Sequence, residues 1–229
     1  MENRSGKSEL DQLMLVQKEK LAKGAEATIY KGSFLYNPVI LKHRHPKEYR
    51  CQKLDQTIRL SRLRAEARVM TLAWKIGARV PVLLGIDTPN RTLMIEELTG
   101  KTLFSILNST PIPDLKNIFK EVGSQVGLLH KNNIIHGDLT VFNVIIMKGN
   151  EPWLIDFGLS SISIEIETKA DDILTFHNTL KAIFAQYQIL FDIFKVGYLK
   201  VYKKGRNTFE HMKKIQSRAR YISRNERLE

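Results

Sequence analysis

Two short stretches, HGDLTVFN at residues 136–143 and IDFG at residues 155–158, decide what this sequence can fold into. Asp138 and Asn143 stand five positions apart in a loop-like segment, and Asp156 lies in WLIDFG, which forms a hairpin-like pattern with the preceding NVIIMKG. Carboxylate and amide oxygens are suitable ligands for a hard cation that also holds phosphate oxygens. The spacing therefore predicts a site for phosphoryl transfer, in which Asp138 accepts or orients the proton of the nucleophile while Asn143 and Asp156 hold metal ions.

A cation for the phosphates and its partner lie upstream, in the order that this chemistry needs. Lys42 falls in VILKH, which has the pattern of a strand, and Glu66 falls in a segment from about Asp55 to Ala73 with helical periodicity. The apolar residues that set this periodicity are Ile58, Leu63, Ala67, Met70 and Trp74. Glu66 lies on or near the buried face, where an unpaired charge is costly, so we expect it to pair with Lys42. Asp55 is expected to cap this helix and Gly77 to end it.

Each of these residues also has an ordinary structural interpretation when it is taken alone. Asp138 and Asn143 could cap a turn, and Asp156 could simply end a strand. That interpretation leaves unexplained why five positions fall in order on suitable elements, and the combination favours phosphoryl transfer. His136 is expected to support the loop backbone, and His43, His45 and His130 are expected to be structural or surface residues.

The chain predicts an α+β fold in two lobes. Strand patterns occupy residues 15–22, 27–34 and 39–43, with turns at 23–26 and 36–38, and two more strands are expected within 80–98, where Pro81 restricts the first to an edge or an end. Helical periodicity begins after Thr99-Gly100 and dominates from Lys169 onward. We therefore expect an N-terminal extension over 1–14, an N-lobe over 15–98, a C-lobe over 99–216 and a basic tail over 217–229.

The composition is that of a soluble globular protein. Of the 229 residues, 43% are hydrophobic and 26% are charged, and Cys51 is the only cysteine, so no internal disulfide can form. The N-terminus lacks the apolar core of a signal peptide, and the apolar stretch IFAQYQILFDIF is interrupted by two Gln and an Asp. We expect an intracellular protein with no membrane association.

Several strings resemble the protein-kinase superfamily and, within it, one small branch. KGAEATIYKG at 23–32, HRHPKEYR at 43–50, LDQTIRLSRLRAEARVM at 54–70, HGDLTVFN and IDFGLS are similar to PRPK-type kinases, the kinase subunit of the KEOPS (EKC) complex. The resemblance runs from about Lys18 to the C-terminal tail. RIO kinases are the nearest competing family, but the KGAEA turn and the basic tail favour the PRPK type. The resemblance implies a protein-kinase-like fold, with a small antiparallel β lobe carrying one main helix and a reduced, mainly helical C-lobe.

The same resemblance implies ATP and Mg²⁺ as cofactors and assigns roles to particular residues. Lys42, Glu66 and Asp138 are the catalytic set, and Asn143 and Asp156 are the metal ligands. The residues that contact the nucleotide are Lys23, Gly24, Ala25, Glu26, Lys42, Glu96, Leu98, Asn143 and Asp156. Backbone groups of Glu96 and Leu98 would bond the adenine, although the spacing alone fits a simple surface loop equally well.

The chain departs from ordinary kinases in ways that carry physical meaning. Gly24 is the one glycine in the loop over the phosphates, and Glu26 brings a negative charge toward them. Gly137 stands where many kinases have an Arg that grips a phosphorylated loop, and Thr140 stands where they have a Lys that steadies the γ-phosphate. SSISIEIETKA alone separates Leu159 from the Asp171-Asp172 pair, where the next helix is expected to begin, and no APE motif follows. These departures favour an ATPase, or a kinase of narrow scope.

For function, the resemblance implies an atypical small serine/threonine kinase with ATPase activity that supports threonylcarbamoyladenosine modification of tRNA. Its implied partners are the metal-containing, ATPase-fold transferase subunit and a small regulatory subunit, and we expect it in the cytoplasm, with a nuclear location left open. Two alternatives remain open: a conventional serine/threonine kinase that acts on proteins, and a non-catalytic scaffold that binds RNA.

The charge of the chain concentrates near its C-terminus. The net charge is +12, and from Lys195 to the end eleven Lys or Arg face three Asp or Glu, a balance of +8. Arg218, Arg220 and Arg224 are candidate contacts to tRNA phosphates, with Tyr221 a candidate for stacking on a base. A basic helix packed on the C-lobe, with its charges in solvent, is the alternative.

Overall fold

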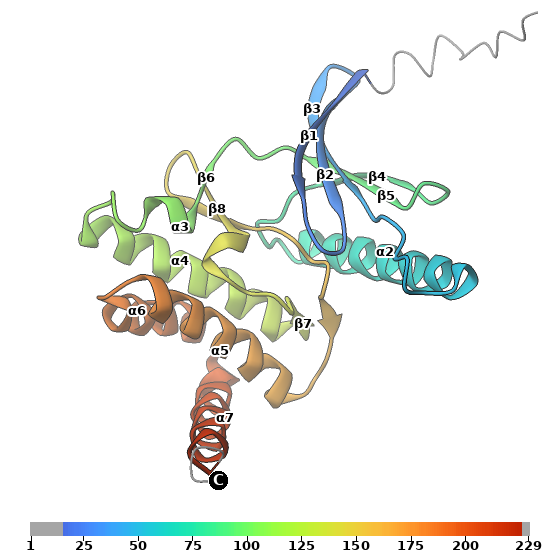
Figure 1. The fold of residues 1–229 in the computed structure, drawn as a ribbon. Helices are drawn as coiled ribbons and strands as arrows, with labels where there is room; N and C mark the ends of the chain where they lie inside the picture. The colour runs from blue at the N-terminus through green and yellow to red at the C-terminus, as the bar shows by residue number, and fades with distance from the viewer. Residues whose placement is uncertain (1–15, 226–229) are drawn as a thin grey trace, which may run out of the picture. The chain divides into compact units, whose positions relative to one another are not determined.

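The computed structural model describes residues 16–225, and the side chains of residues 19–218 within that range. Two compact units are present: residues 16–67 with 81–97, and residues 68–80 with 98–225 (Figure 1). Residues 68–80 belong to the second unit because the chain around Arg79 is bonded there. Its N–H donates to Gln125 Oε1 (2.8 Å), and its carbonyl accepts from the N–H of Leu154 (2.9 Å). The expected 1–14 extension lies outside the described residues.

The first unit is built on a five-stranded antiparallel sheet, as the sequence predicts. Its order is β1-β2-β3-β5-β4 (Figure 1). The strands are β1 (Val16–Lys23), β2 (Thr28–Phe34), β3 (Asn37–His43), β4 (Leu83–Asp87) and β5 (Thr92–Glu96). β4 is an edge strand and begins after Pro81, which is where a proline is tolerated. The β2–β3 turn is centred on Leu35 and Tyr36, both with positive φ, one residue earlier than the sequence suggested.

Helix α2 (Gln52–Lys75) covers one face of this sheet with Leu63 and Ala67, which pack against Leu93. The prediction that Asp55 caps the helix is wrong, because its N–H already donates to the carbonyl of Cys51 inside the first turn. The Asp55 carboxylate is buried and accepts from the backbone N–H of Lys47 (3.2 Å) and from Arg59 (2.6 Å). It therefore ties the preceding segment to the helix. Gly77 ends the helix region with φ +82°, as expected.

The second unit is mainly helical. Its helices are α3 (Leu103–Ile106), α4 (Ile112–Lys131), α5 (Ile166–Ile183), α6 (Tyr187–Val201) and α7 (Arg206–Asn225). α4 and α6 lie side by side (Figure 1), and they approach closely through glycines. A Cβ at Gly123 would lie 2.0 Å from the carbonyl oxygen of Phe194, and one at Gly197 would lie 1.8 Å from that of Lys120. The backbones can therefore touch only where side chains are missing.

Short strands and 3₁₀ turns connect these helices and carry the two motifs. They are β6 (Lys101–Thr102), β7 (Ile134–Ile135), η1 (Val141–Asn143), β8 (Val144–Met147), β9 (Glu151–Leu154), β10 (Ser161–Ile162) and η2 (Lys203–Gly205). β8 and β9 form the predicted hairpin, and β10 pairs with β7. Over residues 16–225, no helix combines the length and the apolar character needed to cross a membrane.

Candidate active site

The predicted pair of Lys42 and Glu66 is present in the first unit. Lys42 Nζ lies 2.6 Å from Glu66 Oε1, and both side chains are buried. Lys42 is fixed because β3 lies between two strands, where it pairs with Ile29 of β2 and Leu93 of β5. Glu66 comes from α2, one residue before the core residue Ala67. The tertiary packing of helix on sheet therefore supplies the buried partner that the charge of Glu66 requires.

The loop between β1 and β2 contains Gly24, Ala25 and Glu26, and Lys23 ends β1 before it. It closes as a tight turn, in which the N–H of Gly24 donates to the carbonyl of Ala27 (2.9 Å). Lys47 Nζ donates to the carbonyl of Ala25. A cation from outside the β1–β2 hairpin thus holds a loop that lacks the usual three glycines.

The negative charge of Glu26 is compensated within the first unit, which the sequence did not suggest. Arg62 Nη1 of α2 lies 2.6 Å from Glu26 Oε2, and Lys47 Nζ lies 3.9 Å from Oε1. Burial alone would raise the pKa of Glu26, but the charge and hydrogen bond of Arg62, with Lys47 and Arg50, outweigh it and lower that pKa. Arg62 was missed because its distance of 36 positions from Glu26 gives no local signal.

The predicted hinge residues lie at the boundary between the two units. Glu96 ends β5 in the first unit, and Leu98 begins the second. The N–H of Glu96 donates to the carbonyl of Val82 (2.9 Å), and its carboxylate accepts from the N–H of Val82 (3.1 Å). The N–H of Glu96 is therefore not available to an adenine. The hinge role of Glu96 and Leu98 stays a prediction.

Asp138 and Asn143 come together in the second unit. Asn143 Nδ2 donates to the Asp138 carboxylate (2.9 Å) and to its backbone carbonyl (2.8 Å). η1 sets this geometry, since it turns the chain so that a residue five positions on reaches back to Asp138. The amide nitrogen of Asn143 faces Asp138, which leaves the amide oxygen as the atom that can ligate a cation. The carbonyl of Asn143 accepts from the N–H of Ile155 (3.0 Å), which joins this loop to the strand before Asp156.

Asp172 of α5 holds the catalytic loop, which is the segment 136–143 that carries Asp138. The sequence analysis missed this role. Its two carboxylate oxygens accept from the backbone N–H groups of His136 (2.6 Å) and Gly137 (2.7 Å). His130 Nε2 lies 3.2 Å from the same carboxylate. Burial alone would raise the pKa of Asp172, but the hydrogen bond and charge of His130, with His136, lower it below its usual value. The sequence did offer one signal for a buried carboxylate, since Asp172 stands between the apolar residues Ala170 and Ile173.

His136 supports the loop, as expected, and does so from a fully buried position. Its Nε2 lies 3.0 Å from the carbonyl oxygen of Ile155, and its ring packs on Phe157. Burial lowers the pKa of His136 despite the nearby carboxylates of Asp172, Asp156 and Asp138. The neutral ring therefore links the catalytic loop to the segment that carries Asp156.

Backbone conformation marks two positions of these motifs. Asp156 has φ +62°, unusual for a residue with a side chain and typical of functional sites. Its carboxylate accepts from the N–H of Gly158 (3.1 Å). Gly137 has φ +81°, and a Cβ there would lie 2.1 Å from the carbonyl oxygen of Leu159. An Arg cannot occupy this position without moving the backbone.

The donor set of the second unit fits a divalent cation held jointly with phosphates. Asn143 and Asp156 both offer hard oxygen ligands. Within residues 16–225 no group of three or more His, Cys, Asp or Glu side chains forms a cage for a metal ion. A cation bound by one or two protein oxygens takes its other ligands from phosphate and water. The site therefore suits a metal that arrives with a nucleotide.

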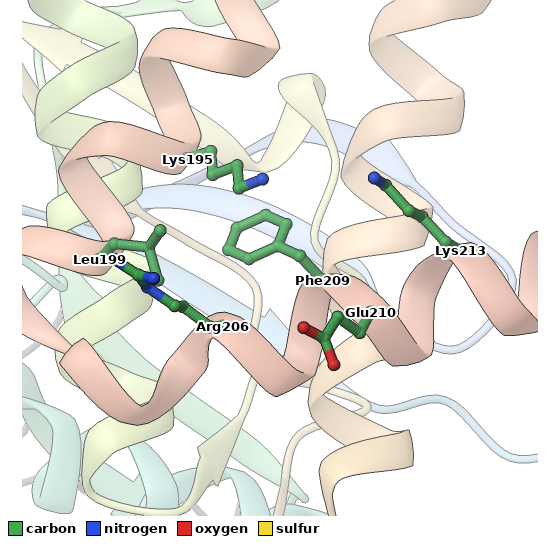
Figure 2. Close-up of a pocket in the computed structure, with 6 residues that line it drawn as sticks. All are labelled: Lys195, Leu199, Arg206, Phe209, Glu210 and Lys213. Atoms are coloured by element: carbon green, nitrogen blue, oxygen red, sulfur yellow. The ribbon is translucent and has the colours of Figure 1, made fainter.

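The basic C-terminal region is partly described. The side chain of Arg218 is 71% exposed and lies 3.7 Å from Glu167, whereas the side chains of Arg220 and Arg224 lie outside the described range. Upstream, a pocket of about 300 Å³ opens between α6 and α7 (Figure 2). Its lining residues are Lys195, Leu199, Arg206, Phe209, Glu210 and Lys213. Lys195 Nζ lies 5.2 Å from the centre of the Phe209 ring, so the pocket combines cations with an apolar floor.

The fold and these motifs define a protein kinase. The family model of the protein kinase domain matches residues 16–219. Enzymes of this class are ATP-dependent phosphotransferases that generally need a divalent metal. A KEOPS complex subunit Bud32 from Pyrococcus abyssi is 33% identical over 89% of this chain and 96% of its own length. A "Probable serine/threonine-protein kinase BUD32 homolog" from Archaeoglobus fulgidus is 32% identical over 81% of this chain and 90% of its own. The chain therefore belongs to the Bud32 family of kinases.

Longer relatives also match. A "Probable bifunctional tRNA threonylcarbamoyladenosine biosynthesis protein" from Methanocaldococcus jannaschii is 37% identical over 88% of this chain. The corresponding protein from Methanosphaera stadtmanae is 36% identical over 87% of this chain. The chain spans 36% to 37% of the length of these two relatives, so their names describe more than the matched region.

Proposed function

We propose that this chain binds Mg-ATP and hydrolyses it in support of threonylcarbamoyladenosine modification of tRNA, as a subunit of a KEOPS-type complex. The observation that carries the ATPase part is the segment after Gly158. It enters β10 at once, and α5 begins at Ile166, so little chain is present to form a platform for a protein substrate. The names of the relatives support the tRNA part.

The mechanism follows from the groups present in each unit. Lys42, held by Glu66, would contact the phosphates, while Asn143 and Asp156 would hold Mg²⁺ against them. Bound Mg²⁺ would neutralise charge that develops on the transferring phosphoryl group. Asp138, oriented by the amide of Asn143, would accept the proton of the attacking water. With Thr140 in place of a Lys, stabilisation of that charge would depend on Lys42 and the metal.

The test follows labelled γ-phosphate from Mg-ATP, with wild type and Asp138→Asn, alone and with the transferase subunit and tRNA. The expected result is label in inorganic phosphate, more of it with the partners present, and loss in the variant. Asp192→Asn on the outside of α6 is the matched control and should behave as wild type. Label on a separate protein would favour a conventional protein kinase. Unchanged support of tRNA modification by Asp138→Asn would favour a non-catalytic scaffold.

For tRNA, we propose contacts by Arg218, Arg220 and Arg224 of the tail, extended by the cations of the α6–α7 pocket. Lys195, Arg206 and Lys213 lie around one carboxylate, so the pocket keeps a positive balance. Each cation that neutralises a phosphate adds affinity and salt dependence.

Binding of labelled tRNA over a range of salt concentrations tests this contact. A variant with Lys195→Gln and Lys213→Gln should bind more weakly and with a shallower salt dependence than wild type. Lys200→Gln, an exposed lysine of α6 outside the pocket, is the control. Equal salt slopes for the three proteins would exclude the pocket from the contact, and an unchanged slope on deletion of 217–229 would exclude the tail.

A further inference from the structure

Glu66 has a second cationic partner, Arg44, in addition to the Lys42 that phosphoryl transfer requires. Arg44 Nη2 lies 2.5 Å from Glu66 Oε2, on the opposite carboxylate oxygen from Lys42. The side chains of Lys42, Arg44 and Glu66 are only 10%, 3% and 2% exposed. Arg44 lies two residues after Lys42, just beyond the end of β3, and its side chain reaches the same carboxylate as Lys42. One carboxylate is thus shared by Lys42 of β3 and by Arg44 in the segment that follows this strand.

The backbone of Arg44 is itself anchored. Its N–H donates to the carbonyl of Arg91 (3.0 Å), and its carbonyl accepts from Arg59 Nη1 (3.2 Å). Its buried Nε has no hydrogen-bond partner among the described residues. A buried donor without a hydrogen-bond partner is unfavourable. A guanidinium placed only for packing would therefore be expected to rotate so that its Nε finds an acceptor. The observed orientation instead directs it at Glu66.

The three side chains carry a net charge of +1, whereas a pair of Lys42 and Glu66 alone would be neutral. Glu66 therefore keeps a buried counter-charge when Lys42 shares its three ammonium donors with a nucleotide, since a guanidinium does not deprotonate.

We propose that Arg44 is a positioning residue that holds Glu66 in place for Lys42, so that the phosphate-binding cation is set by the folded strand and needs no phosphorylated loop to assemble it. This inference rests on the proposed nucleotide site. It accounts for a kinase that has Gly137 in place of an Arg able to grip a phosphorylated segment. Arg44 does not itself contact the nucleotide in this role.

The test compares binding of Mg-ADP and of adenosine to the full-length chain by calorimetry. Arg44→Met should weaken Mg-ADP by about tenfold, within the range of coupling between charged neighbours, and leave adenosine unchanged. Arg44→Lys should recover part of the loss, because it restores a cation near Glu66. Arg64→Met removes an exposed arginine of α2 and is the matched control, expected to bind both ligands as wild type does.

A merely structural role gives a different pattern, in which adenosine and Mg-ADP weaken together in Arg44→Met. Equal binding of Mg-ADP by Arg44→Met and wild type also overturns the proposal. In a Glu66→Gln background Arg44→Met should add little further loss, and full additivity would show that Arg44 does not act through Glu66. Failure of wild type to bind Mg-ADP would instead refute the proposed nucleotide site.

Discussion

Asp172→Asn should destabilise the protein strongly, because one buried carboxylate holds the loop that carries Asp138. It accepts from two backbone N–H groups, of His136 and Gly137, and its side chain is 2% exposed next to His130. A hydrogen bond to a charged group contributes about 1.5–3 kcal/mol. Asparagine keeps one acceptor oxygen but directs an amide NH₂ at a donor. Removing one partner of a buried pair typically costs about 3–5 kcal/mol, which is the loss we expect here.

For a domain of this size, 1 kcal/mol changes Tm by roughly 2–4 °C, so Tm should fall by roughly 6–20 °C. Thermal unfolding followed by circular dichroism measures it, and ATP hydrolysis by the folded fraction should fall as the loop loses its support. Asp171→Asn is the matched control. Partial burial and the nearby charges of Glu167 and Asp172 raise the pKa of Asp171, which means that its negative charge is unfavourable in the folded protein. Removing that charge should leave Tm unchanged or slightly higher. Equal Tm values for the two variants would refute the assignment of Asp172 as the support of the loop.

Three further predictions follow from the site. Gly137→Ala should lose about 1–3 kcal/mol of stability from its positive φ alone, and more from the contact with the Leu159 carbonyl; denaturant unfolding measures this, and a stability equal to wild type would contradict it. Arg62→Met should raise the KM for ATP several-fold by exposing the charge of Glu26. Its Tm should barely change, because these side chains are 38% and 43% exposed and solvent screening keeps such pairs below about 1 kcal/mol; a large fall in Tm with constant KM would contradict this. Since burial depresses the pKa of His136 below 6.5, its neutral form supports folding fully above pH 6.5. That support is lost as pH falls toward the folded-state pKa, by at most about 1.4 kcal/mol per pH unit. The His136→Gln variant should therefore show a flatter dependence of the unfolding free energy on pH between 7.5 and 5. Parallel curves for the variant and wild type would exclude this role of His136.

Local patterns in the sequence predicted most of the elements. The strands expected over 27–34 and 39–43 are present over 28–34 and 37–43, and the helix around Leu63 and the hairpin after Asn143 are present too, because each depends on residues close in the chain. Element ends were less well predicted. Asp55 was expected to cap α2 but accepts hydrogen bonds from Lys47 and Arg59, since the need of a buried carboxylate for donors outweighed its preference for a helix end.

For the candidate site, the sequence alone predicted the residue types and their order: Lys42, Glu66, Asp138, Asn143 and Asp156. It could do so because phosphoryl transfer needs a cation, a proton acceptor and oxygen ligands, and these chemical requirements appear directly as residue identities.

Beyond the predicted pair of Lys42 and Glu66, only the tertiary structure decided which charges meet. Arg44 shares Glu66, Arg62 compensates Glu26, and Asp172 holds a loop 35 positions upstream. None of these contacts is periodic or local, so no sequence pattern signals them. They form because a charge taken out of water must find a partner wherever the packed chain brings one within reach.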